Sequence, residues 1–175
     1  MTPRIAGGVI PPSTPEKPIL WASERVTVGD ADVRDLAIVV RPTSRVSGRV
    51  EFLGSKPGPT GTALSEAVYI NIYPATGQGL GAATSPDPNG TFATGVPAGS
   101  YFAAAEDFPF PGWYFNAALF EGRDISDTAV EIKGDISGVV IQFSDEVSEI
   151  AGTVRNAKGA AESNGSVVVF PTDRQ

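Results

Sequence analysis

The sequence predicts an all-β protein, an antiparallel β-sandwich of about seven strands that recurs in tandem. Two observations carry the prediction. Short runs rich in β-branched residues are separated by Gly, Pro or Asp, and a similar pattern of residues returns after about 100 positions. Gly and Pro number 20 and 15 in 175 residues, and their scatter between apolar runs indicates many turns and hence many short strands.

Composition argues against several classes of function. The 20 acidic and 13 basic residues give a net charge of -7, which repels a phosphate backbone, so no nucleic acid partner is predicted. The chain has no His and no Cys, which removes Ser-His-Asp and Cys-His catalysis, His or thiolate zinc sites, and disulfides. Only carboxylate, hydroxyl or lysine chemistry remains, and we predict neither enzyme activity nor a cofactor.

The beginning of the chain reads as an extended, Pro-rich lead-in over residues 1–20. Gly and Pro interrupt its short apolar run, so it does not resemble a signal peptide, and a signal for an exported parent protein is expected upstream. No run approaches the roughly 20 apolar residues that span a bilayer, so no membrane span is predicted.

From Trp21 onward the pattern changes to strands. In residues 67–74, Val68, Ile70 and Ile72 fall on one side of an alternating run, and Tyr69, Asn71 and Tyr73 fall on the other, as expected for a strand with one face in a core. The other early strands are predicted at residues 26–28, 36–40 and 46–52.

The middle of the chain contains the strongest turn signals. Asn89-Gly90 tolerates positive φ and predicts a tight hairpin, and Pro97–Gly99 is expected to join two further strands. Residues 113–120 hold the largest aromatic cluster. A helix over residues 116–125 is the alternative there, since Asn116 could cap it and Ala and Leu favour helix.

An internal repeat defines the predicted domains. Residues 26–50 match residues 130–154, with a one-residue insertion before the acidic turn of the second copy, and residues 68–76 resemble 167–173. In the first pair of segments, Gly48 corresponds to Gly152 and Val46 to Ile150. The period is near the size of one immunoglobulin-like sandwich, which has about 100 residues.

The repeat divides the chain into the end of one unit, a complete unit and the start of a third. We hypothesise that the strands at the two ends pair with each other, because they correspond to the last and first strands of the same type of unit. The predicted boundaries are residues 21–43, 44–144 and 147–175.

The segment DPNGTFATGVPAGSY resembles the signature of carboxypeptidase regulatory-like domains, in which an Asn-Gly or Asp-Gly hairpin leads to an aromatic strand, a Pro-Gly turn and a Tyr. It is also similar to transthyretin-like, collagen-adhesin B-type and starch-binding-like sandwiches. The resemblance implies a transthyretin-like fold without chemistry, in an exported bacterial protein of several repeats. It rests on Asn89, Gly90, Phe92, Val96, Pro97, Gly99 and Tyr101.

Acidic residues are the remaining candidates for a metal or catalytic site. Asp124 and Asp127 could ligate Ca²⁺ or act as a glycosidase pair, although turn residues that accept backbone N–H bonds are favoured. Equivalent turns could hold Ca²⁺ between successive units, but their spacing is not that of an EF-hand, so no metal is predicted. These turns contain Asp30, Asp32, Asp35, Asp145, Glu146 and Glu149.

Two lysines are candidates for an isopeptide crosslink, a bond known in adhesin-like sandwiches. Lys56 lies in a GSKPGPTG loop, and Lys133 precedes the Gly134-Asp135 turn. Such a bond requires a lysine buried beside Asn or Asp, and neither position indicates burial.

Aromatic residues supply the candidate ligand site. Phe110, Trp113 and Tyr114, with Phe108 and Phe115 beside them, could form a platform for a sugar or a partner protein. Rings in a sandwich more often belong to its core, which is the favoured interpretation.

The predicted function is a non-catalytic extracellular or cell-envelope module that acts as a structural spacer or a protein-interaction domain. Its expected partners are neighbouring repeats of the same chain, and a polysaccharide or another envelope protein. The alternative is a carbohydrate-binding module that uses residues 108–115.

Overall fold

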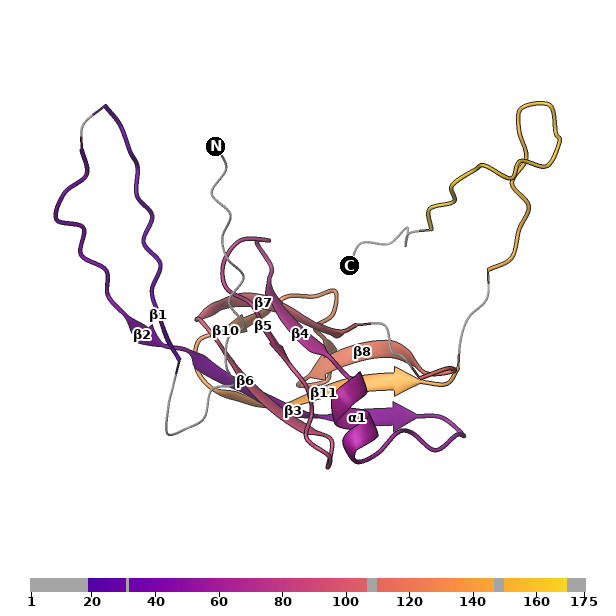
Figure 1. Cartoon of the computed structure of the whole chain (residues 1–175), viewed down its shortest axis with the longest axis horizontal. Coiled ribbons are helices and arrows are strands. Elements are labelled where there is room, and N and C mark those ends of the chain that lie inside the picture. Colours follow the sequence, from indigo (N-terminus) through magenta and orange to yellow (C-terminus); the bar gives the residue numbers. More distant parts are fainter. Residues whose placement is uncertain (1–18, 31, 107–109, 147–149, 170–175) are drawn as a thin grey trace.

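A computed structural model of the chain describes residues 19–30, 32–106, 110–146 and 150–169. Two sheets pack face to face, and the described residues contain almost no helix (Figure 1). The predicted all-β class is therefore confirmed. A third, two-stranded sheet stands apart from the sandwich and joins β1 (Leu20–Trp21) to β2 (Arg41–Pro42).

The two sheets of the sandwich have four and five strands in the described chain. In order across the first sheet lie β10 (Val130–Ile132), β7 (Gly99–Ala105), β4 (Ile70–Pro74) and β5 (Ala82–Thr84). The second has β6 (Thr91–Val96), β3 (Ser44–Leu53), β11 (Ile136–Ser144), β8 (Tyr114–Phe120) and β9 (Arg123–Asp124).

The core lies between these sheets. Strand β4 has the predicted alternation, since Ile70 and Ile72 are buried and Tyr73 is exposed. Tyr69, directly before the strand, is exposed as well. From the other sheet, β11 contributes side chains with none of their surface exposed, among them Phe143. Because successive strand residues point to opposite faces, each strand gives the core every second side chain.

The first and last strands of the sandwich, β3 and β11, lie side by side and parallel. Their pairing runs from Ile136 opposite Val46 to Ser144 opposite Leu53, with an irregularity between Ile136 and Val139. Gly138 lies at that irregularity with φ 86°, a conformation that glycine adopts without strain. All other strand pairs in the two sheets of the described chain are antiparallel.

The turn signals mark chain reversals that cross between the sheets. The chain reverses at Asn89-Gly90 as predicted, and the amide of Gly90 donates to the Asp87 carbonyl at 2.9 Å. However, β5 before the turn and β6 after it belong to different sheets, so the prediction of a simple hairpin is wrong. Pro97–Gly99 joins β6 to β7 as predicted, and it also crosses from one sheet to the other.

The helix alternative over residues 116–125 is wrong. The segment forms β8 and β9 around Glu121-Gly122, where φ values of 50° and 77° suit a tight two-residue hairpin. Pairing of β8 with β11 on its other side outweighs the helix propensity of Ala and Leu. The helix of the described chain, α1 (Thr62–Ala67), was not predicted, and its Leu64 is buried in the core.

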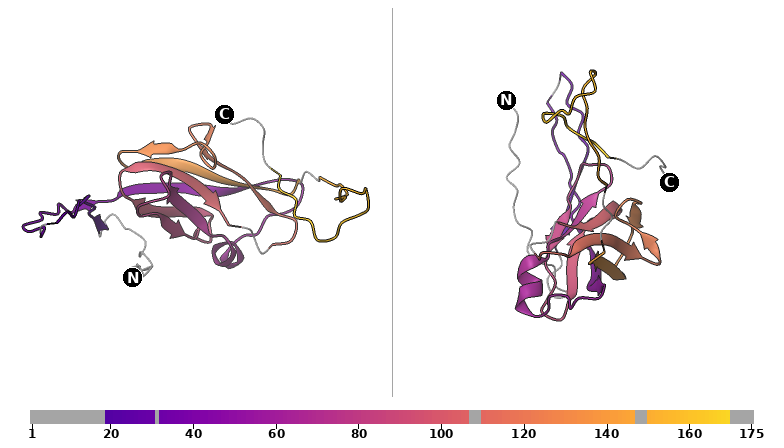
Figure 2. Two further views of the ribbon diagram at one scale, coloured as in Figure 1. Left: turned by 90° about the horizontal axis from the view of Figure 1, so that it is seen from above. Right: turned by 90° about the vertical axis from the view of Figure 1, so that its right-hand side faces the viewer.

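Two arms extend from the sandwich, an N-terminal arm of residues 19–30 and 32–42 and a C-terminal arm of residues 150–169. The predicted strands at residues 26–28 and 36–40 are not formed, because no described strand lies beside them. The C-terminal arm holds one isolated bridge, between Arg155 and Ala161. The arms leave opposite ends of the sandwich (Figures 1 and 2). Their described residues do not pair with each other, so the hypothesis that they do is wrong for this part of the chain.

Replacing Phe143 by alanine tests the position of the core. Phe143→Ala is expected to lower the free energy of unfolding by about 3–5 kcal/mol, because it leaves a cavity where β11 faces the other sheet. Tyr69→Ala, at an exposed ring directly before β4, is the control and should change the free energy of unfolding by less than about 0.5 kcal/mol. Urea denaturation measures both, and equal losses would contradict this placement.

Candidate functional site

The candidate aromatic site is divided between the core and the surface. The Trp113 side chain is buried, with 6% of its surface exposed, and its ring meets that of Phe52 edge-on at a centroid distance of 5.0 Å. The Phe52 ring in turn stacks on Phe143 at 5.4 Å, and Phe115 meets Phe143 edge-on at 6.2 Å. Trp113 thus belongs to an aromatic cluster inside the sandwich.

Tyr114 faces the other way, with 49% of its surface exposed. Tyr114 and Phe115 are successive residues of β8, so Phe115 points toward the core while Tyr114 points outward. Phe110 is partly buried and packs against the core. Phe110, Trp113 and Tyr114 therefore do not form one flat platform, and Phe108 lies outside the described residues.

The turn that starts the family-like motif is held by a residue that sequence reasoning missed, Asp87. Its carboxylate accepts the amides of Asn89 and Thr91, both at 2.9 Å, and the Thr91 hydroxyl at 2.8 Å. Gly90, with φ 83°, completes the reversal. An Asp two residues before Asn-Gly is a recognisable Asx-turn signal, so it could have been identified from the sequence.

The rest of the motif builds the core rather than a ligand site. Phe92 and Tyr101 are buried, and the Tyr101 hydroxyl donates to the Leu80 carbonyl at 3.2 Å. Pro97 is also buried, whereas Gly99 is partly exposed at the start of β7. Desolvation raises the pKa of Tyr101 above its usual value.

Asp124 and Asp127 act as turn residues. The Asp124 carboxylate accepts the amide and hydroxyl of Ser126 at 2.9 and 2.7 Å, and Asp127 accepts from Thr128 at 3.1 Å. Asp32 pairs with Arg34 at 2.8 Å on the exposed N-terminal arm. No group of three or more carboxylates is placed to hold a metal ion within the described residues, which exclude Glu149.

The two candidate lysines for a crosslink are exposed, in the loop after β3 and in the turn after β10. Lys56 and Lys133 therefore lack the buried setting that an isopeptide bond requires.

An open groove is the other surface feature that the sequence did not indicate. It has a volume of about 710 Å³ and lies between β5 and β6, the edge strands of the two sheets. Tyr69 and Phe92 supply apolar surface, and Arg45 and Asp87 supply charge. Its position depends on which strands end at each sheet edge, which a single sequence does not specify.

No protein-family model, curated protein or solved structure matches the chain. Within the residues that the structure describes, no helix has the length and apolarity to cross a membrane.

A glycan titration tests the placement of the aromatic residues. Because the Trp113 ring is inside the sandwich, soluble glycans should produce no saturable change in tryptophan fluorescence. A saturable change would contradict this placement if it disappeared in Trp113→Phe while the variant kept the unfolding midpoint of the parent chain. Trp21 remains in this variant and reports any response from the N-terminal arm.

The Asp87 turn is expected to make the stability of the fold depend on pH. Hydrogen bonds first from the amide and hydroxyl of Thr91, then from Asn89 and Gly90, lower the pKa of the Asp87 carboxyl. A lowered folded-state pKa adds stability above the unfolded value of about 3.9, and this stability is lost as the pH falls through the folded value.

The variant Asp87→Asn keeps an acceptor oxygen but has no charge to lose. Its urea unfolding midpoint should therefore fall less than that of the parent chain between pH 6 and pH 3. Asp127→Asn, on an exposed turn, is the control and should keep the parent's pH dependence. Parallel curves for the parent chain and Asp87→Asn would contradict the role of this carboxylate.

Proposed function

We propose that the chain is a non-catalytic module of an extracellular or cell-envelope protein, in which it acts as a structural spacer within a tandem array of similar units. Support comes from the resemblance of residues 87–101 to carboxypeptidase regulatory-like domains and from the internal repeat. The packed motif residues and the turn roles of the acidic residues agree with a module that does no chemistry.

One observation favours a load-bearing spacer: the chain enters the sandwich through β3 and leaves it through β11, its parallel neighbour. Parallel strands start at the same end, so the start of β3 and the end of β11 lie at opposite ends of the sheet (Figure 2). Tension between neighbouring units then pulls the two strands past each other. Hydrogen bonds along the whole pair carry this load together and must yield together.

Carboxylates in the flanking loops fasten both ends of the pair. Before β11, the Asp135 carboxylate accepts the Arg45 amide at 2.7 Å. After β11, the Asp145 carboxylate accepts the amides of Ser55 and Lys56 at 3.0 and 3.1 Å. Each contact ties a loop next to β11 to one end of β3, so it resists sliding of the strands.

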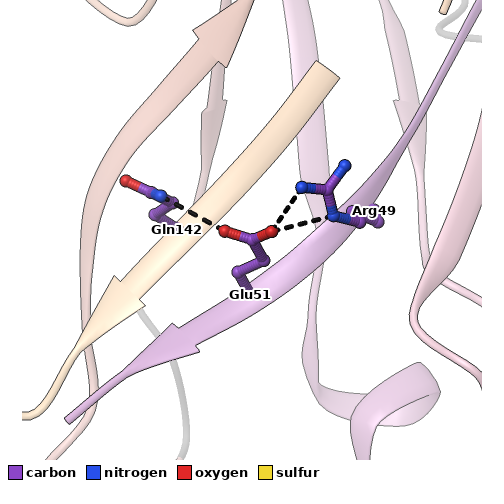
Figure 3. A network of polar contacts seen from close by, with 3 residues as sticks. All are labelled: Arg49, Glu51 and Gln142. Atoms are coloured by element: carbon purple, nitrogen blue, oxygen red, sulfur yellow. Dashed lines mark hydrogen bonds and ion pairs between the residues drawn. The ribbon is translucent and has the colours of Figure 1, made fainter. Parts of the chain in front are cut away.

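A side-chain network joins the same strands between these ends. Figure 3 shows the Glu51 carboxylate of β3 between Arg49 of the same strand, at 2.8 Å, and Gln142 of β11, at 3.3 Å. Hydrogen bonding by Arg49, with a smaller contribution from Gln142, lowers the pKa of Glu51 despite its partial desolvation. The carboxylate is therefore charged at neutral pH and holds the network together.

Carbohydrate binding through residues 108–115 is less well supported than the spacer function. It needs Trp113 on the surface, and the aromatic cluster with Phe52 keeps that ring inside. A protein-interaction role is compatible with a spacer, because units in an array display their loops.

Direction-dependent force measurements test the load-bearing role. The chain has no Cys, so introduced cysteines are unique handles. Thr43→Cys with Glu146→Cys applies force across the opposite ends of the β3–β11 pair. We expect a higher unfolding force in this geometry than in any geometry that opens the pair one bond at a time.

The control is Leu53→Cys with Glu146→Cys, because Leu53 and Ser144 are partners at one end of the pair and a force applied there peels the strands apart. The folded unit is the same in both variants, so only the direction of load differs. Equal unfolding forces in the two directions would refute a load-bearing β3–β11 pair.

A further inference from the structure

The two arms expose the apolar positions that the sandwich buries. The internal repeat places Ile38 where β11 has Ile141, and Ile150 where β3 has Val46. Ile141 and Val46 are 0% and 2% exposed, whereas Ile38 and Ile150 are 54% and 78% exposed. Leu36, Val40 and Val154 are exposed as well, which is a large apolar surface to leave in water.

Backbone geometry supports this correspondence independently of the side chains. In β11, Gly138 has φ 86° at the irregularity that precedes Val139. Asp35 occupies the corresponding position, directly before Leu36, and has φ 57°. Positive φ is uncommon for residues other than glycine. The N-terminal arm thus has a positive φ at the position that corresponds to Gly138 of β11, although no described strand lies beside it.

We propose that the N-terminal arm of one copy of this chain binds the C-terminal arm of a second copy, through a parallel pairing that reproduces the contact between β11 and β3. The N-terminal arm supplies a β11-type segment, residues 36–40, and the C-terminal arm supplies a β3-type segment, residues 150–154. Each segment resembles one partner of the largest strand pair in the sandwich.

The correspondence specifies the register. Val139 pairs with Gly48, and Ile141 with Val50. Transferred to the arms, Leu36 lies opposite Gly152, and Ile38 lies opposite Val154. Between these pairs, Ala37 is expected opposite Thr153, as Val140 is opposite Arg49.

Gly152 is the most informative position in this interface. A side chain at Gly48 would collide with the Val139 carbonyl and the Phe92 ring, so glycine is required where β3 meets β11. At Gly152 nothing lies within 4 Å of an added Cβ, and this position has no positive φ. The arm by itself does not need a glycine there, whereas the proposed pairing with Leu36 does.

The partner arm comes from a second copy, because the two arms of one copy leave opposite ends of the sandwich (Figures 1 and 2). The contact is heterologous, since each copy offers one segment of each type. A heterologous contact that does not close adds further copies instead of stopping at a dimer. The inference rests on the proposed tandem array for its meaning in the parent protein, but its test is independent of the force measurement.

Complementation between two variants of the full chain tests the proposal. Leu36→Asp with Ile38→Asp disables the N-terminal arm, and Ile150→Asp with Val154→Asp disables the C-terminal arm. We expect the parent chain to increase in average mass with concentration and each variant to remain monomeric. Their equimolar mixture should double in mass and stop there, because it contains one intact arm of each type per pair.

Sedimentation equilibrium measures these masses. A parent chain that remains monomeric at all concentrations, or a mixture that remains monomeric, would overturn the proposal. So would a variant that dimerises alone, since that would indicate a symmetric contact. These substitutions lie on the arms, so urea unfolding of the sandwich should be unchanged, and force measurements on the sandwich remain valid whichever result is obtained.

Two finer variants test the register. Gly152→Ala should abolish association and leave the unfolding midpoint unchanged, whereas Gly29→Ala on the other arm should have no effect on either. Under oxidation, Ala37→Cys mixed with Thr153→Cys should form a covalent dimer faster than Ala37→Cys mixed with Arg155→Cys. Association that tolerates Gly152→Ala, or equal rates of crosslinking, would overturn the proposed pairing.

Discussion

The sandwich depends on the close parallel contact between β3 and β11. At Gly48 the backbone of β3 lies against the Val139 carbonyl, with no space for a side chain. These two strands have β6 and β8 as their outer neighbours, so the contact fixes the order of the five-stranded sheet. Ile141 and Phe143 then point from β11 toward Ile70 and Ile72 of the opposite sheet, and the core forms between them.

This contact joins distant parts of the chain, since Glu51 and Gln142 are 91 residues apart. Pairing at such a separation closes a long loop and lowers the entropy of the chain. This loss is offset only when the two sheets pack against each other. The arms illustrate the same dependence. Residues 36–40 have a strand-forming pattern similar to β11, yet they form no strand where no described β3-type neighbour lies beside them. High β-propensity is therefore not sufficient, and a neighbouring strand is needed for the segment to form a strand.

Local features of the fold could be predicted from the sequence, whereas its sheet order could not. Alternation identified the buried face at Ile70 and Ile72, and Asn89-Gly90 identified a chain reversal, because both are set by neighbouring residues. Assignment of β5 and β6 to different sheets depends on contacts far along the chain. Strand alternation also places Tyr114 and Phe115 of β8 on opposite faces, so an aromatic platform that includes both rings could have been rejected from the sequence.

Two glycines link the strand pair that closes the sandwich with the proposed contact between two copies of the chain: Gly48 lies in the first and Gly152 in the second. Glycine weakens a strand, because it has no side chain to pack and loses more conformational freedom on folding. At Gly48 the close approach to β11 offsets that cost. Gly152 lies in no strand and open space surrounds it, so within the described chain nothing requires a glycine at this position. A glycine there is explained if the C-terminal arm acts as a strand beside a β11-type neighbour, in the same parallel arrangement that closes the sandwich.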